Sequence, residues 1–252
     1  MIEVRELYKS FGGVHAVRGV SFTARDGEIT GIIGPNGAGK TTILRMIYTV
    51  LTPDSGTTLV DGIDARVDRR AVQRRLGVLP DVRGLYPRLT AREHVRYFGE
   101  LHGLERLEIE TRTTGLVATL AMEDFVDRRA KGFSRGQQMK VALARALVHQ
   151  PHNVMLDEPT NGLDVASSRA MRELLRRFRA EGRCVLLSSH IMQEVAALAD
   201  RIVIVAGGRV AVQGTPAELR QATGVEDLEE VFMAATRPAF GPAAAPALTA
   251  VG

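Results

Sequence analysis

Apolar and polar residues alternate in two stretches near the beginning of the chain, residues 2–7 and 19–25, in the manner of half-buried strands. A turn signal, Asp-Gly at 26–27, follows the second stretch, and an uninterrupted apolar run occupies residues 29–33. Another strand and turn are expected over residues 57–64. The N-terminal section is therefore predicted to form a small antiparallel sheet.

The pattern becomes helical between residues 81 and 150, after a short apolar strand over residues 76–79. Thr90 and Glu93 have the spacing of a capping box, and apolar residues follow at helical intervals, namely Val95, Phe98, Leu101 and Leu104. A second helical stretch holds Leu116, Leu120, Phe125 and Val126, and a third spans residues 137–148. Such a block of helices between strands indicates an inserted subdomain.

Apolar strands return at residues 153–156, which run into Asp157, and at residues 183–188. Between them, Asp164 can cap a helix that continues to Ala180. Alternating strands and helices are typical of a mostly parallel sheet, in which ligands bind beyond the carboxyl ends of the strands.

The last part of the chain is simpler. Residues 202–205 and 209–212 are predicted to form a hairpin, and Pro216 opens a short helix at its first position. The alanine- and proline-rich residues 237–252 have little to bury, and we expect them to be disordered.

Composition limits the classes of function. No window approaches the roughly eighteen apolar residues of a membrane span, and the acidic start is not a secretory signal. A cytosolic location is expected, and the single cysteine, Cys184, excludes an intrachain disulfide. The net charge of +4 arises from 33 basic and 29 acidic residues that are interspersed, so no nucleic-acid partner is expected.

Residues 34–42 read G-P-N-G-A-G-K-T-T, the pattern of a phosphate-binding loop. Glycines let several backbone N–H groups approach a phosphate chain, Lys40 would reach the β- and γ-phosphates, and the Thr41 hydroxyl would ligate Mg²⁺. The alternative, a glycine-rich turn, is disfavoured because the loop lies between a strand and a helix. The candidate binding residues are Gly34, Asn36, Gly37, Ala38, Gly39, Lys40, Thr41 and Thr42.

Two carboxylates and a histidine follow the later strands. Asp157 is placed to hold Mg²⁺, and Glu158 to orient or deprotonate the water that attacks the γ-phosphate. The alternative is a pair of acids that ends a strand without a chemical role. The presence of a phosphate loop in the same chain disfavours that alternative. His190 could bind the γ-phosphate and fix Glu158, whereas the other five histidines are interpreted as surface or packing residues.

The segment 133–138, Phe-Ser-Arg-Gly-Gln-Gln, resembles the signature motif of ATP-binding cassette (ABC) ATPases. The phosphate loop, this segment, Asp157-Glu158 and His190 occur in the order of that family, and the resemblance covers about residues 2–232. Phe11 matches the family's adenine-stacking aromatic, although a core role for it is about equally expected from spacing alone.

The resemblance implies ATP and Mg²⁺ as ligands and a head-to-tail homodimer. Ser134 and Gly136 of one copy, together with Gln137, would contact the γ-phosphate held by the other. It also implies a separate integral membrane transporter subunit, which would place the chain at the cytoplasmic face of the membrane.

The implied fold class is α/β, a phosphate-loop NTPase (RecA-like) core with a mostly parallel sheet, an N-terminal antiparallel β subdomain and an inserted helical subdomain. The predicted divisions are 1–80 and 151–222 for the two parts of the ATP-binding core, 81–150 for the helical subdomain, and 223–252 for a C-terminal extension and tail.

Two positions depart from the family pattern. Arg135 stands where glycine is usual, so a cation is expected near the second copy's phosphate or beside the dimer seam. Asp81 stands where a magnesium-binding glutamine is usual, and its carboxylate either binds Mg²⁺ more tightly or points away. The run 81–90 and Arg135 resemble the sodium-exporting (NatA-type) branch.

Three interpretations compete at this point. The leading one is the ATP-hydrolysing subunit of an exporter, for sodium or else for a drug or lipid cargo. The second is a soluble cassette ATPase that acts on ribosomes or DNA, and such relatives generally carry two cassettes or long insertions. The third, a phosphate-loop kinase or GTPase, leaves the segment 133–138 and His190 without a role.

Overall fold

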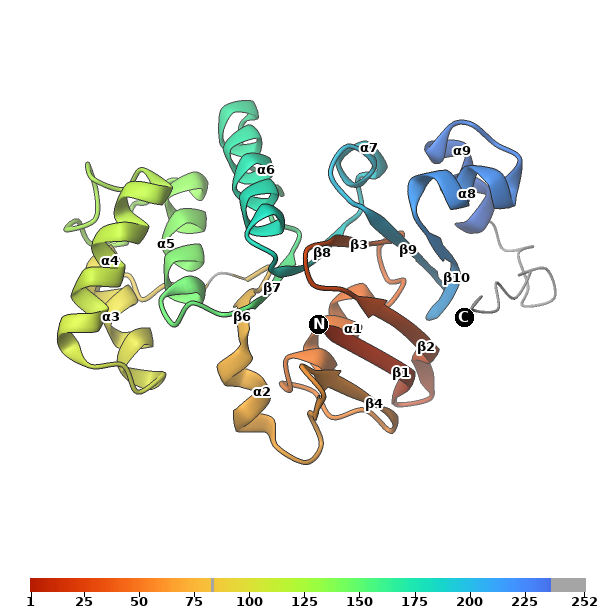
Figure 1. Ribbon diagram of the computed structural model, residues 1–252, viewed down its shortest axis with the longest axis horizontal. Helices are drawn as coiled ribbons and strands as arrows, with labels where there is room; N and C mark the ends of the chain where they lie inside the picture. The colour runs from red at the N-terminus through yellow and green to blue at the C-terminus, as the bar shows by residue number, and fades with distance from the viewer. Residues whose placement is uncertain (83, 237–252) are drawn as a thin grey trace.

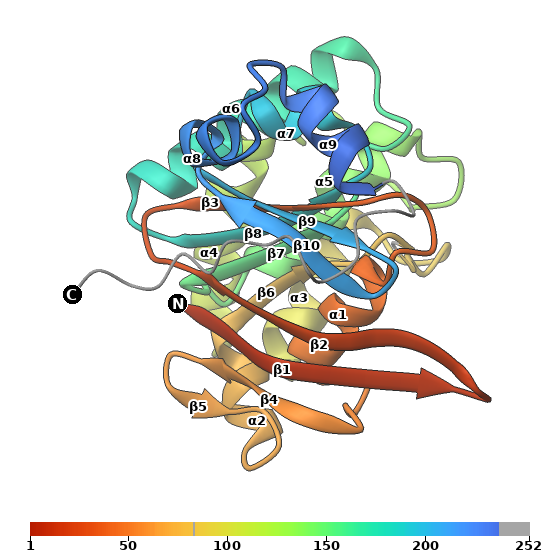
Figure 2. The same ribbon diagram turned by 90° about the vertical axis from the view of Figure 1, so that its right-hand side faces the viewer.

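The computed structural model describes residues 1–82 and 84–236, and the prediction for the tail at 237–252 lies outside them (Figure 1). The described residues form a six-stranded sheet and a four-stranded sheet. Helices α6 and α7 lie on one face of the larger sheet, and the smaller sheet lies on the other (Figures 1 and 2). None of the described helices is long and apolar enough to cross a membrane.

The smaller sheet confirms the predicted antiparallel N-terminal section. Its order is β2-β1-β4-β5, with every neighbouring pair antiparallel. Its strands are β1 (Ile2–Phe11), β2 (Val14–Ala24), β4 (Ser55–Val60) and β5 (Ile63–Asp64). The first two are longer than the alternating pattern predicted, because backbone pairing continues through exposed polar positions to the turn at Gly12.

The larger sheet has the order β10-β9-β3-β8-β7-β6, parallel except for the β9–β10 hairpin that the sequence predicted. Its strands are β3 (Ile29–Ile33), β6 (Leu76–Leu79), β7 (Asn153–Asp157), β8 (Cys184–Ser189), β9 (Arg201–Ala206) and β10 (Arg209–Gly214). Every residue of β3, β7 and β8 is buried, which explains their continuous apolar runs.

Side chains at alternate positions of these strands feed two separate apolar cores. Ile33 packs in the core that includes Leu174 of α6, whereas its neighbour Ile32 packs in the core that includes Leu44 of α1. The first core contains residues from α6 (Val165–Ala180), α7 (Met192–Ala196), α8 (Pro216–Thr223) and α9 (Leu228–Thr236). The second core lies between the two sheets around α1 (Lys40–Ile47). The edge where the strands end is thus held rigidly from both faces.

Three further helices, α3 (Ala91–Leu101), α4 (Arg106–Leu120) and α5 (Arg135–Leu147), gather beside the β6 edge of the larger sheet (Figure 1). The capping box predicted at Thr90 and Glu93 is confirmed. The second predicted helix was too long, because α4 ends at Leu120 and its C-cap residue, Ala121, has a left-handed backbone with φ 48°. Phe125 and Val126 lie in the turns beyond it, although both are buried in the core.

Other local predictions have mixed outcomes. Asp164 caps α6 through the Ser167 N–H at 2.7 Å, and Pro216 is the first residue of α8, as predicted. The sequence reading did not identify α2 (Arg69–Arg75), α7 or α9, since short helices carry too few turns for a periodic pattern. The division of the chain at residues 80, 150 and 222 stays a prediction.

Candidate functional site

Three predicted chemical segments meet at one edge of the larger sheet. Strand β8 lies between β3 and β7 and is parallel to both, so the carboxyl ends of the three strands are neighbours. Ile33 pairs with Ser189, and Asp157 pairs with Ser188. The same edge of the sheet therefore carries the loop after β3, the acids after β7 and His190 after β8.

The loop 34–39 owes its shape to two glycines in particular. A Cβ on Gly34 would lie 2.2 Å from the Val205 carbonyl oxygen. Gly39 has φ +106°, and a Cβ there would lie 2.6 Å from the Ala16 carbonyl oxygen. Any side chain at either position would push the loop off the strands that support it.

Lys40 begins α1 and is 7% exposed. Its ammonium donates to the carbonyl oxygen of Gly34 at 2.6 Å and to that of Pro35 at 3.3 Å. Burial lowers the pKa of this ammonium, while the charges of Glu158 and Asp157 act in the opposite direction. The charge is held inside the loop in a partly desolvated place, where an anionic ligand would stabilise it.

The start of α1 has no side-chain cap. Gly39 is the N-cap residue and offers no side-chain oxygen to the first N–H groups of the helix. These donors and the positive end of the helix dipole face the loop. Of the other predicted loop residues, Asn36 and Gly37 are exposed, Ala38 is buried, and Thr41 and Thr42 are half-buried in the first turn.

Asp157 is 4% exposed at the end of β7 and accepts a hydrogen bond from the Ser188 hydroxyl at 2.5 Å. The same hydroxyl accepts from the Glu158 backbone N–H at 3.1 Å. Ser188 thereby fixes both acids, and it is a functional candidate that the sequence reading missed. A polar residue at the end of an apolar strand was the available signal, and only the register of β7 and β8 places it opposite Asp157.

Glu158 leaves the strand with a left-handed backbone, φ 50°, which turns its side chain away from the sheet. Its carboxylate Oε2 lies 2.8 Å from Nδ1 of the exposed His190. Glu158 and His190 are thus brought together as the sequence predicted, and their chemical roles stay a prediction.

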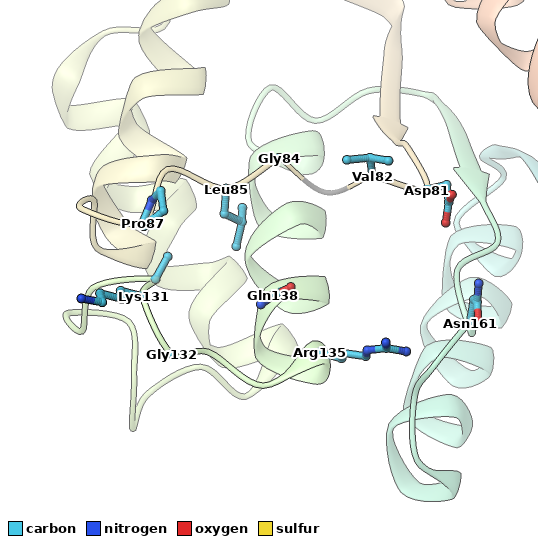
Figure 3. Close-up of a pocket in the computed structure, with 11 residues that line it drawn as sticks. Asp81, Val82, Gly84, Leu85, Pro87, Lys131, Gly132, Arg135, Gln138 and Asn161 are labelled. Atoms are coloured by element: carbon cyan, nitrogen blue, oxygen red, sulfur yellow. The ribbon is translucent and has the colours of Figure 1, made fainter.

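Asp81 follows β6, one strand beyond Asp157, and is exposed. It lines a cavity of about 630 Å³ together with Arg135, Gln138 and Asn161, and residues from the loop before α3 (Figure 3). Within residues 1–82 and 84–236, no group of three His, Cys, Asp or Glu side chains is arranged to hold a metal ion. Thr41 in the first turn of α1 and Asp157 at the end of β7 carry oxygen donors of the kind that Mg²⁺ prefers, and their role as metal ligands stays a prediction.

The segment 134–137 forms the first turn of α5. The Ser134 hydroxyl accepts from the Gln137 N–H at 3.2 Å, and the Gln137 side chain accepts from the Ser134 N–H at 3.1 Å. A Cβ on Gly136 would lie 3.4 Å from Ser167 Oγ, so this turn abuts the start of α6. The contacts of the segment are with α6 and its preceding loop.

Phe11 ends β1 and is 48% exposed. The Lys9 ammonium lies 5.6 Å from the centre of its ring. The β1–β2 hairpin reaches the phosphate loop through Ala16, whose carbonyl oxygen is the close neighbour of Gly39. An exposed aromatic on this hairpin suits the predicted adenine contact, which stays a prediction.

Three of the other five histidines pack within the fold, and His15 and His152 are exposed. His94 Nε2 accepts from the Tyr86 N–H at 2.8 Å, and the rings of His102 and His149 stack with their centres 3.6 Å apart. Burial lowers the pKa of His149 to about 4, and its Nε2 lies 3.1 Å from the Leu76 carbonyl oxygen.

A family model described as "ABC transporter" matches residues 17–161. The chain is 46% identical over 221 residues to the "ABC transporter ATP-binding protein NatA" of Bacillus subtilis (strain 168), which covers 87% of this chain and 90% of the relative. It is 37% identical over 215 residues to the "Nod factor export ATP-binding protein I" of Rhizobium meliloti (strain 1021), with 85% and 64% covered.

Solved structures agree with this assignment. One described as the "Structure of ATP binding subunit of ABC transporter" has a TM-score of 0.87 at 29% identity and covers 94% of this chain and 100% of its own. A dimeric ATP-binding cassette in a post-hydrolysis state, bound to ADP and Pi, has a TM-score of 0.78 at 25% identity, with 85% and 98% covered.

Proposed function

The chain belongs to the ABC transporter family, and from that membership we propose that it powers export through a separate membrane-spanning subunit. Its own part is that of the ATP-binding subunit, and it is an ATPase. The observation that carries the proposal is the meeting of the Lys40 loop, Asp157 and the Glu158–His190 pair at one sheet edge. ATP binding and ATP hydrolysis can both be assigned to that edge.

The phosphates would be bound by the loop and by the start of α1. Backbone N–H groups of residues 34–42 and the Lys40 ammonium supply donors and positive charge. The Thr41 hydroxyl and the Asp157 carboxylate, which the Ser188 hydroxyl holds in place, are the proposed ligands of Mg²⁺. Bound Mg²⁺ supplies neutralisation of charge on the phosphates. For Asp81 we propose a place at the rim of the site, because its cavity is shared with Arg135 and Asn161.

Hydrolysis is assigned to Glu158 and His190. The Glu158 carboxylate would accept the proton of the attacking water or orient it toward the γ-phosphate. His190, with Nδ1 2.8 Å from that carboxylate, would hold its orientation, and in the imidazolium form Nε2 would also donate to the phosphate. The left-handed backbone at Glu158 sets the direction in which its side chain leaves β7.

A second copy of the chain would complete the site. In this subunit Ser134 and Gln137 cap the start of α5, and Gly136 lies beside Ser167 of α6. We therefore assign them to the ATP of a partner copy in a head-to-tail dimer, an arrangement supported by the dimeric cassettes among the similar structures.

The membrane subunit would meet the chain at a groove of about 620 Å³ beside β6, which would place the chain at the cytoplasmic face of the membrane. Apolar side chains and two arginines of α2 line this groove: Tyr48, Leu76, Val78, Phe98, Leu101, Arg70 and Arg74. Leu101 is 64% exposed there. We propose that a partner segment with an apolar face and carboxylates occupies it, because the groove offers apolar surface beside positive charge.

Glu158→Gln tests the catalytic assignment. We expect ATP hydrolysis to fall at least about a hundredfold while ATP binding is retained, since the amide cannot accept the proton but leaves the loop intact. Hydrolysis is measured by phosphate release and binding by equilibrium titration. Glu173→Gln, an exposed α6 carboxylate paired with Arg169, is the matched control. Hydrolysis at the wild-type rate in Glu158→Gln would refute the assignment.

The cargo is proposed to be Na⁺, on the resemblance of residues 81–90 and Arg135 to the sodium-exporting branch. Co-expression with the membrane subunit should give ATP-dependent Na⁺ efflux that Glu158→Gln abolishes. If the pair hydrolyses ATP and exports a drug or lipid instead of Na⁺, the export proposal stands and the cargo is wrong.

A further inference from the structure

The side chain of Arg135 lies across Gly162 of the same subunit. Gly162 has φ +71°, and a Cβ on it would come within 2.3 Å of Arg135 Nη1 and 3.1 Å of Arg135 Cδ. The guanidinium and its stem therefore occupy the space that any other residue at 162 would need. The sequence expectation placed this cation near the second copy's phosphate or at the dimer seam, and the structure gives it a neighbour within its own chain.

This contact joins two segments that carry proposed chemistry. Arg135 is the first residue of α5, directly after Ser134. Gly162 belongs to the loop 158–164, which begins with Glu158 and ends with Asp164, the N-cap of α6. Arg135 thus touches the loop between the catalytic carboxylate and α6.

The loop 158–164 has contacts along its length. The Asn161 N–H donates to the Glu158 carbonyl oxygen at 3.2 Å, and the Thr160 hydroxyl donates to Glu194 of α7 at 2.5 Å. Leu163 packs against the core, whereas Gly162 is exposed and lies beside the Arg135 side chain. Figure 3 shows that side chain extending from the first turn of α5 toward Asn161.

The cavity that Asp81 lines also has Arg135 in its lining. Asp81 is the one acidic side chain among the described residues that line the cavity, and Arg135 lines it from the other side (Figure 3). The two positions that depart from the family pattern therefore face the same cavity.

We propose that Arg135 is a positioning residue that holds the loop 158–164 against the first turn of α5 in the same subunit. The segment 134–137 and Glu158 then keep a fixed relative position. A phosphate that contacts the segment 134–137 therefore influences the position of Glu158. This inference rests on the proposed function, because it assumes that the segment 134–137 meets the ATP of a partner copy. Planarity suits arginine to the role, since a flat guanidinium can lie against a residue without a side chain.

A double-mutant cycle on Arg135→Gly and Gly162→Ala tests the contact. Arg135→Gly should lower kcat for ATP about tenfold and leave KM within about twofold, because positioning is lost while the phosphate loop is unchanged. Gly162→Ala should lower kcat at least as much, since its methyl group displaces the guanidinium and a Cβ is disfavoured at φ +71°. The double variant should be no slower than the slower single variant, because the methyl group then meets no arginine.

Two further variants complete the experiment: a conservative replacement of Arg135 and a substitution of a matched arginine elsewhere in the chain. Arg135→Lys should recover only part of kcat, since an ammonium does not present a flat surface. Arg106→Gly is the control, because Arg106 is also the first residue of its helix, is exposed, and lies in α4 away from the loop. Its kcat should equal that of the wild type. Thermal unfolding of every variant checks that the fold is retained.

A double variant whose kcat loss is the product of the two single losses would overturn the inference, as would a wild-type kcat in Arg135→Gly. Failure of the proposed function is separable from this result. If Glu158→Gln hydrolyses ATP normally, the catalytic assignment fails whatever the cycle gives. If Glu158→Gln is inactive and the cycle is additive, only the role of Arg135 fails.

Discussion

The starts of α1 and α5 are both proposed to meet phosphate, and the structure builds them in opposite ways. Helix α1 begins after Gly39, which has no side-chain cap, and its first residue is the buried Lys40. Helix α5 begins after the exposed Ser134, which forms a capping box with Gln137. One helix leaves its first N–H groups to a ligand, and the other satisfies part of them itself.

This difference indicates which helix start can bind phosphate without a second copy of the chain. The α1 end has no side-chain cap, a partly desolvated ammonium and a core on each face of the sheet, so we expect it to bind phosphate before a second copy is present. The α5 end is already stable without a ligand, and it rests on α6 and Gly162. We therefore expect this end to add to a site only when another copy brings the phosphate to it.

The largest effect should come from breaking the α1 end. Lys40→Ala removes the cation held 2.6 Å from the Gly34 carbonyl oxygen, and we expect ATP affinity to fall about a hundredfold, roughly 2.7 kcal/mol. Equilibrium titration with a fluorescent ATP analogue measures the loss. Lys140→Ala is the matched control, because Lys140 is a lysine of α5 that donates to the Ala121 carbonyl oxygen at 2.8 Å. Equal affinities for the two variants would contradict the comparison.

The second prediction concerns the C-terminal end of α5, which acid should destabilise. The helix ends at Leu147, and His149 beyond it stacks on His102 of the α3 end, with a pKa lowered by burial to about 4 from 6.5. The unfolded chain takes up a proton at His149 between pH 6.5 and 4, whereas the folded chain resists it. Stability should therefore fall as pH decreases through this window, by on the order of 2 kcal/mol.

Urea unfolding at several pH values measures that slope. His149→Gln should flatten it between pH 6.5 and 4, while the exposed His15→Gln should leave it unchanged. An equal slope in wild type and His149→Gln would show that this histidine is not responsible.

The smallest effect should come from the α5 cap itself. Ser134→Ala removes the oxygen that accepts from the Gln137 N–H, and we expect a stability loss of about 1 kcal/mol. ATP affinity of the isolated subunit should be unchanged, because the α1 end is separate. Urea unfolding and nucleotide titration measure the two quantities. A weaker ATP affinity in this variant would mean that the two ends are not independent within one chain.

Much of the Lys40 side of the molecule was predictable because its signals are local. The loop 34–42 needs glycines at fixed places, and the strands before it and before Asp157 are continuous apolar runs. Since these strands are parallel, the sequence reading could also place His190 beside Glu158, and the 2.8 Å contact confirms that they meet. Short helices such as α2 and the early end of α4 escaped the reading, because packing rather than periodicity sets them.

By itself, the sequence predicted where phosphate chemistry would lie, and it determined which strands would be buried and that Thr90 and Asp164 would cap helices, because each depends on residues a few positions apart. Only the tertiary structure decided that Ser188 holds Asp157, that Ala16 supports Gly39, and that Arg135 lies on Gly162. These contacts join distant parts of the chain, and their existence depends on strand register and on the direction in which a side chain leaves its helix. Local propensity carries no information about either, so the same arginine that suggested a dimer seam in the sequence contacts its own subunit in the fold.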